Sequence, residues 1–106
     1  MIEEKSIFSK IIDKELPADI VYEDDKCIVI KDINPQARVH LLIIPRKPIA
    51  TLFDLKPEDK DCMGHMILLL PQLAQTQGLD GFKTQINTGE SGGQEVFHIH
   101  IHLLGN

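Results

Sequence analysis

The spacing of apolar and polar positions changes along the first third of the chain. Apolar residues over 7–12 follow helical spacing behind Ser6, a favourable N-cap residue, and Pro17 comes after the pattern ends. This spacing predicts a short helix. Two runs rich in β-branched residues, 20–22 and 27–30, then flank the pair Asp24-Asp25. Such runs around a turn-forming pair predict a β-hairpin.

A third strand and a longer helix are predicted in the middle of the chain. Residues 39–44 form an apolar run that Pro45 should end, because proline cannot donate to a ladder. Pro57 predicts a helix start, Gly78 its end and Pro71 a kink within it. The stretch Met66–Leu70 is apolar around the whole helix. Because a chain this short has little material to cover every side, we expect a partner subunit.

Alternation with a period of two dominates the last third. Residues 82–87 predict a strand, and a glycine-rich turn over 88–93 follows it. Residues 96–104 predict a final strand, in which His98, His100 and His102 share one face and apolar side chains occupy the other. The pattern therefore predicts a face that packs and a face that is available for chemistry.

Composition limits the class of protein. The 106 residues are enough for a single domain, 1–106, and 42% hydrophobic with 25% charged residues is typical of a soluble globular protein. The net charge of −5 disfavours nucleic acid as a partner, and no apolar run approaches the roughly 18 residues of a membrane span. Two isolated cysteines predict reduced thiols, and the N-terminus lacks a secretory pattern. We expect a cytoplasmic protein.

The histidine face allows three interpretations. Exposed histidines without a role are improbable in strict alternation beside a Gly-Gly turn. A zinc site is possible for two strand neighbours, but His98 and His102 would lie about 13 Å apart on an extended strand. In the third interpretation a neutral imidazole attacks an electrophile while its neighbours orient it and protonate the leaving group. Gly92 and Gly93 favour this one, since their backbone N–H groups could approach an anion.

The segment Gly92–Leu104, GGQEVFHIHIHLL, resembles the signature of the histidine triad (HIT) superfamily. The wider chain is similar to its nucleoside phosphoramidase branch, the histidine triad nucleotide-binding proteins, through residues 7–12, 32–37, 40–45 and Asn87. The resemblance implies an α+β fold, with a five-stranded antiparallel sheet, two helices and a sheet that continues across a homodimer. It also implies hydrolysis of purine nucleoside 5′-phosphoramidates, adenosine compounds for example, through a nucleotidyl-histidine intermediate without a metal or other cofactor.

The resemblance assigns roles to individual residues. His100 matches the nucleophile, His98 and His102 its flanking partners, His40 a fourth histidine that steadies them, and Asp32 the carboxylate that accepts the ribose hydroxyls. The remaining matches surround the base (Ile7, Phe8, Ile11, Ile30, Ile33) or the phosphate (Asn87, Gly93, Gln94, Val96). Without the resemblance, Asp32 could equally cap a turn, and the apolar residues of the first helix could belong to the core.

Two positions lie outside this matching. Glu95 stands where many animal relatives carry a serine, and we expect it to lie near the leaving group. His65 falls in the second helix, outside the motif, where a structural or exposed role is expected. A non-catalytic module that binds a nucleotide or a metal in the same pocket remains the alternative to a phosphoramidase.

Overall fold

The computed structural model describes residues 5–106. Residues 1–4 lie outside the described part. Two predictions rest partly on these four residues: the single domain over 1–106 and the N-terminus without a secretory pattern. Within the described residues, no helix is both long enough and apolar enough to cross a membrane.

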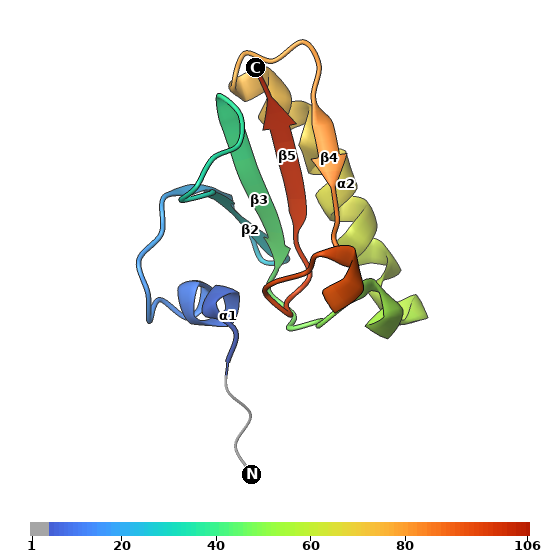
Figure 1. Cartoon of the computed structure of the whole chain (residues 1–106). Helices are drawn as coiled ribbons and strands as arrows, with labels where there is room; N and C mark the ends of the chain where they lie inside the picture. Colours follow the sequence, from blue (N-terminus) through green and yellow to red (C-terminus); the bar gives the residue numbers. More distant parts are fainter. Residues whose placement is uncertain (1–4) are drawn as a thin grey trace.

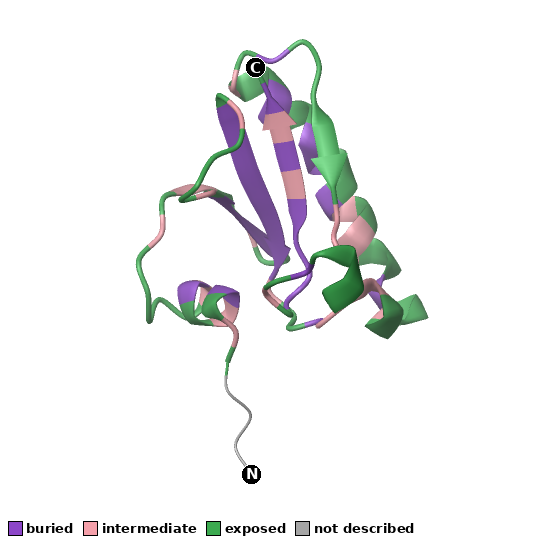
Figure 2. Ribbon diagram, viewed as in Figure 1, coloured by how far each residue is buried: buried purple, intermediate pink, exposed green. Residues whose placement is uncertain are grey.

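Five antiparallel strands form a single sheet in the order β1-β2-β3-β5-β4 (Figure 1). The strands are β1 Ile20–Glu23, β2 Cys27–Lys31, β3 Val39–Pro45, β4 Lys83–Gln85 and β5 Ile101–Gly105. The central strand β3 is buried at each of its residues (Figure 2). The predicted five-stranded antiparallel sheet is thereby confirmed, with β1 and β4 as its edges.

Two α-helices accompany the sheet, as expected. Helix α1, Ile7–Ile12, begins where the Ser6 hydroxyl accepts the backbone N–H of Ser9 at 3.0 Å. Helix α2, Lys60–Thr76, follows the 3₁₀ turn η2, Pro57–Asp59, so the α-helix proper begins three residues after the predicted proline start. Gly78 follows its end with φ of 75°, a conformation that suits glycine.

The two helices cover opposite faces of the sheet. Alternate residues of β3 point to opposite sides. Leu41 and Ile43 belong to the core under α2, whereas Leu42 and Ile44 pack with Phe8 of α1. In the pairing of β3 with β5, Leu42 lies opposite His102. The histidine of β5 therefore lies on the α1 side, and the larger α2 core occupies the other side.

The final strand is shorter than the alternation predicts. Strand β5 begins at Ile101, not at Val96, and the last cross-strand pair is Ile43 with Ile101. Continuing this register would place Pro45 opposite Ile99, and proline has no N–H for the ladder. The Ile99 N–H donates instead to the Ile49 carbonyl at 2.7 Å. The predicted strands over 82–87 and 39–44 are also adjusted, to 83–85 and 39–45.

The apolar run of α2 divides into a buried and an exposed side. Met66, Leu69 and Leu70 are buried against the sheet within this chain. Ile67 and Leu68 are 49% and 70% exposed. Among residues 5–106, only this outward-facing part of the run is left uncovered, and the partner subunit expected to cover it remains a prediction.

Candidate active site

A cavity of about 760 Å³ opens between α1, the sheet and the loop before β5. This volume is in the range of small-molecule sites. All but one of the site residues named from the sequence line it: His40, His100, His102, Asp32, Ile33, Asn87, Gly93, Gln94, Glu95, Val96, Ile7, Phe8, Ile11 and Ile30. Tertiary structure thus gathers residues from both ends of the chain around one space.

His98 is the exception: it precedes strand β5 and lines a separate pocket together with Ser6 and Ser9. Its side chain is buried, and its Nε2 lies 2.8 Å from the Pro45 carbonyl oxygen. A carbonyl only accepts, so Nε2 carries the proton and Nδ1 accepts from the hydroxyls of Ser6 and Ser9, at 3.0 and 3.2 Å. Both ring nitrogens are occupied, which makes His98 a positioning residue in this geometry.

His100 presents a free lone pair as a consequence. Its Nδ1 lies 2.9 Å from the His98 carbonyl oxygen and must donate to it. The neutral ring then has its lone pair on Nε2, the nitrogen that a nucleophile would use. The Phe8 ring packs edge-on against the His100 imidazole, with the ring centroids 4.9 Å apart. His100 is only 8% exposed. The tautomer and the orientation of His100 are both determined by its surroundings.

A second chain of hydrogen bonds determines the tautomer of His102. The backbone N–H of Gln36 donates to His40 Nδ1 at 3.0 Å, so the proton of neutral His40 is on Nε2. That nitrogen lies 2.9 Å from His102 Nδ1 and donates to it. Neutral His102 therefore carries its own proton on Nε2. The His100 and His102 rings lie 4.9 Å apart, centroid to centroid, which places a lone pair beside an N–H donor.

Burial keeps the imidazoles of His98, His100 and His102 neutral. It lowers the pKa of His98 and of His100 below their ordinary value of 6.5. Burial, with repulsion from His100 and His40, lowers the pKa of His102 to about 4. Near neutral pH the nucleophile candidate is therefore unprotonated, and the hydrogen-bond directions derived for neutral rings apply.

Asp32 adds a carboxylate to the edge of this group. Its Oδ2 lies 3.4 Å from His40 Nε2, and its Oδ1 accepts the Asn34 N–H at 2.8 Å. Ligand atoms of Asp32, His40 and His102 all lie within 4.8 Å of one another, a spacing that could hold a metal ion. The metal interpretation of the cavity consequently has a geometric basis, although with a different set of residues from the three alternating histidines.

The backbone N–H groups of the glycine turn, which we expected to approach an anion, have partners within the loop. In the 3₁₀ turn η3, Glu90–Gly92, and just after it, the N–H groups of Gly92, Gly93 and Gln94 donate to carbonyls of the same loop at 3.0 to 3.1 Å. The Gln94 side chain also bonds inward, to Ala50, Val96 and Gly89. These amides hold the loop together instead of pointing at a ligand, because the tight turn uses its own donors.

Comparisons with known proteins identify the family of the chain. A family profile described as scavenger mRNA decapping enzyme C-term binding matches residues 5–106. The chain is 48% identical over 104 residues to a purine nucleoside phosphoramidase of Escherichia coli, covering 96% of this chain and 87% of the relative. It is 52% identical over 103 residues to an uncharacterized HIT-like protein of Synechococcus elongatus, covering 96% and 90%. The chain belongs to the histidine triad family.

Solved structures of other proteins share the fold of this histidine triad protein. The crystal structure of a HIT family hydrolase from Legionella pneumophila superposes with a TM-score of 0.93 at 43% identity, over 96% of this chain and 93% of that one. The HIT-like α+β fold and the family resemblance expected from the sequence are confirmed. Together with the named phosphoramidase, this neighbour supports hydrolase activity in general.

Several residues in and around this histidine triad cavity were not predicted from the sequence to have a role in the site. The serines that bind His98 drew attention only as helix residues, and the Pro45 carbonyl only as a strand end. Ser6-x-x-Ser9 is one helical turn, a spacing that could have suggested a shared partner. Further lining comes from residues that were assigned no site role from the sequence: Leu16, Pro17, Ala18, Lys31, Asn34, Gln36, Leu42 and Gln85.

Proposed function

We propose that this protein hydrolyses the P–N bond of purine nucleoside 5′-phosphoramidates of the adenosine type and releases the nucleoside monophosphate. The observation that carries the proposal is the pairing of a His100 Nε2 lone pair with a His102 Nε2–H beside one cavity. The named activity of the Escherichia coli relative supports the substrate class. The combination of nucleophile and adjacent proton donor suits group transfer from phosphorus.

The reaction follows in two balanced steps. His100 Nε2 attacks phosphorus and forms a P–N bond, while the bond to the amine breaks and the amine leaves with the electron pair. His102 Nε2–H donates a hydrogen bond to the departing nitrogen, and the amine takes up its proton from a water molecule. The hydroxide left by that transfer attacks phosphorus, the bond between phosphorus and His100 breaks, and free His100 and the nucleoside monophosphate result. His98 and His40 hold the two reacting rings in their required tautomers.

The remaining lining provides for a nucleoside. The apolar wall of Phe8, Ile11 and Ile30, buried or nearly so, supplies a surface against which a purine can stack or pack. Asp32 offers carboxylate oxygens at the same mouth for the ribose hydroxyls. Ile33 lines this mouth but is 98% exposed, so a bound base would have to cover it.

A homodimer is part of the proposal. Ile67 and Leu68 form an outward apolar face on α2, and β4, exposed at all three residues, is an edge strand of the sheet. Edge strands expose unpaired backbone groups, and apolar helix faces favour a partner. Pairing of two copies through these elements would bury both.

The alternative function is binding of a metal or a nucleotide without turnover, which the Asp32, His40 and His102 spacing favours. The test is release of adenosine monophosphate from adenosine 5′-phosphoramidate, with and without EDTA. We expect turnover in both conditions, since imidazole attack needs no Lewis acid. Activity that EDTA removes and zinc restores would support the metal site instead.

Two variants locate the chemistry. His100→Ala should lose hydrolysis by at least about 10³-fold while nucleotide binding stays measurable. Asp80→Asn changes an exposed residue outside the cavity and should retain wild-type turnover. In wild type, mass spectrometry of the quenched enzyme should find a nucleotidyl group on His100. Near-normal turnover by His100→Ala would reject the nucleophile assignment.

A further inference from the structure

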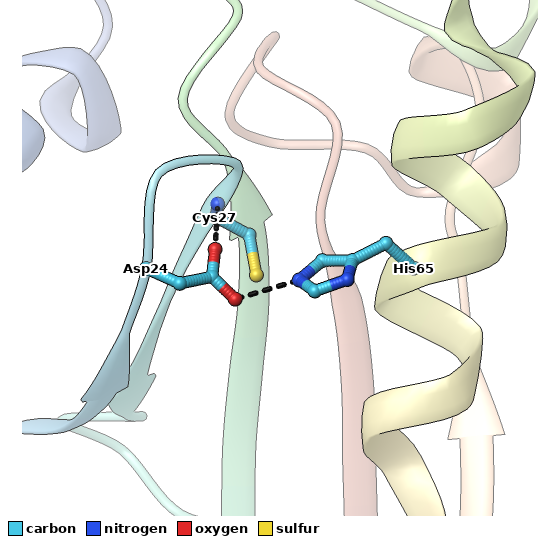
Figure 3. A group of neighbouring side chains, drawn as sticks. All are labelled: Asp24, Cys27 and His65. Atoms are coloured by element: carbon cyan, nitrogen blue, oxygen red, sulfur yellow. Dashed lines mark hydrogen bonds and ion pairs between the residues drawn. The ribbon is translucent and has the colours of Figure 1, made fainter.

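Three potential metal ligands meet on the α2 side of the molecule, at the turn between β1 and β2. Asp24 lies in the turn, Cys27 is the first residue of β2, and His65 comes from the first half of α2 (Figure 3). Their ligand atoms all lie within 4.8 Å of one another, and His65 Nε2 lies 2.6 Å from Asp24 Oδ2. None of the three lines the histidine cavity. The cluster is therefore separate from the site of the proposed function.

A fourth donor, Cys62, contacts the same turn but lies outside the group of ligand atoms within 4.8 Å. Cys62 is one helical turn before His65, and its Sγ contacts the Lys26 carbonyl of the same turn at 3.9 Å. The two sequence pairs are thus Asp24-x-x-Cys27 and Cys62-x-x-His65. They bring together both cysteines of the chain and the one histidine of five that is outside the triad group. Two thiols, one imidazole and one carboxylate form a donor set that suits tetrahedral zinc.

The carboxylate is already held in place. Asp24 Oδ1 accepts the N–H groups of Lys26 and Cys27 at 2.8 and 2.9 Å, and Oδ2 accepts the Tyr22 hydroxyl at 2.8 Å. Hydrogen bonds of this kind orient metal ligands before the ion arrives. The carboxylate and His65 are partly exposed, with 18% and 31% of their side chains accessible, so an ion can reach them from solvent.

A reactive-thiol role fits the cluster less well. Cys27 is fully buried, and burial raises the pKa of its thiol to about 12. A protonated, inaccessible thiol is a poor nucleophile. A divalent ion differs in that it displaces the thiol proton to solvent as it binds.

We propose that Asp24, Cys27, Cys62 and His65 form a structural zinc site that ties the β1–β2 turn to α2. Its function is stabilisation, because the ion would crosslink two elements far apart in sequence. This inference does not depend on the proposed hydrolysis. The cavity group of Asp32, His40 and His102 is the competing site, and it contains no sulfur. Sulfur ligation therefore distinguishes the two.

The experiment is a titration of the chelator-treated full chain with Co²⁺, followed by displacement with Zn²⁺. We expect one equivalent that shows thiolate-to-cobalt charge-transfer absorption, and a zinc-dependent rise in the thermal midpoint. His65→Gln should weaken binding of this ion by at least about 10-fold, and Cys62→Ser should reduce the sulfur absorption. Both positions are partly exposed, so these variants test the site even if Cys27→Ser fails to fold.

His102→Ala is the control variant, since it removes the competing cavity site. It should keep the sulfur absorption. Cobalt binding without thiolate-to-cobalt absorption would overturn the proposal. It would also be overturned if this absorption were unchanged in both His65→Gln and Cys62→Ser. Absence of binding at stoichiometric concentrations would also overturn it, and would identify the cluster as a hydrogen-bonded link between the turn and the helix.

Discussion

Acid should destabilise this protein through His102 before its carboxylates are protonated. Burial and the neighbouring histidines, His100 and His40, lower the pKa of His102 from 6.5 to about 4, against a weaker opposing attraction from Asp32. Each factor of ten in proton affinity is about 1.4 kcal/mol, so the folded state disfavours the imidazolium by about 3 kcal/mol at most.

The sign of the effect follows from which state binds more protons. Between about pH 6.5 and about pH 4 the unfolded chain protonates this histidine and the folded chain does not, so the free energy of unfolding falls as the pH falls. Between about pH 7 and pH 5 the single group should cost about 2 kcal/mol. His98 and His100, whose pKa values are also lowered by burial, act in the same direction.

The assay is urea unfolding at a fixed protein concentration, repeated at several pH values in wild type and in His102→Gln. The variant lacks the titrating group, so its free energy of unfolding should fall by about 2 kcal/mol less over this range. Carboxylates with a lowered pKa, such as Asp24, lose their contribution only below about pH 3.8 and leave the window clear. Equal pH dependence in the two proteins, within about 0.5 kcal/mol, would refute the reasoning.

Three further predictions concern the leaving group, the outer face of α2 and the glycine turn. Glu95 is exposed at the cavity rim, and Glu95→Ser should reduce the kcat/KM preference for cationic over neutral amine leaving groups several-fold, about 1 kcal/mol; an unchanged preference would exclude a role for the carboxylate. Leu68→Glu should give monomers that remain folded, by light scattering and circular dichroism, whereas Leu69→Glu buries a charge and should unfold the chain; a dimeric Leu68→Glu protein would place the interface elsewhere. Gly93→Ala should lose about 1 to 2 kcal/mol of stability in urea, because φ is 85° and the new Cβ would lie 3.3 Å from a neighbouring amide nitrogen, while Gly81→Ala, with open space around it, should lose much less.

The sequence by itself determined the elements and most of the residues around the cavity. Local rules sufficed for the Ser6 cap, the Asp24 turn and the stop at Gly78, because each depends on backbone groups within a few residues. The resemblance carried by the histidine motif then named thirteen residues that, with Glu95, line one cavity, and local spacing alone could not have joined them.

Tertiary structure decided where each histidine is located and what it can do. The alternation of His98, His100 and His102 predicted one strand face, but the sheet partner ends in Pro45, and the ladder stops with it. His98 consequently turns toward Ser6 and the Pro45 carbonyl. Which nitrogen carries each proton depends on partners up to 92 residues away, and no spacing rule contains that information.

The α2 helix shows the same limit for surfaces and clusters. Composition marked Met66–Leu70 as apolar on every side, yet only packing against the sheet separates Leu69, which is core, from Leu68, which is exposed. Cys62 and His65 read as isolated residues of a helix in the sequence. They contact the β1–β2 turn only because antiparallel pairing brings this turn next to α2. The fold as a whole determines such contacts between residues far apart in the sequence.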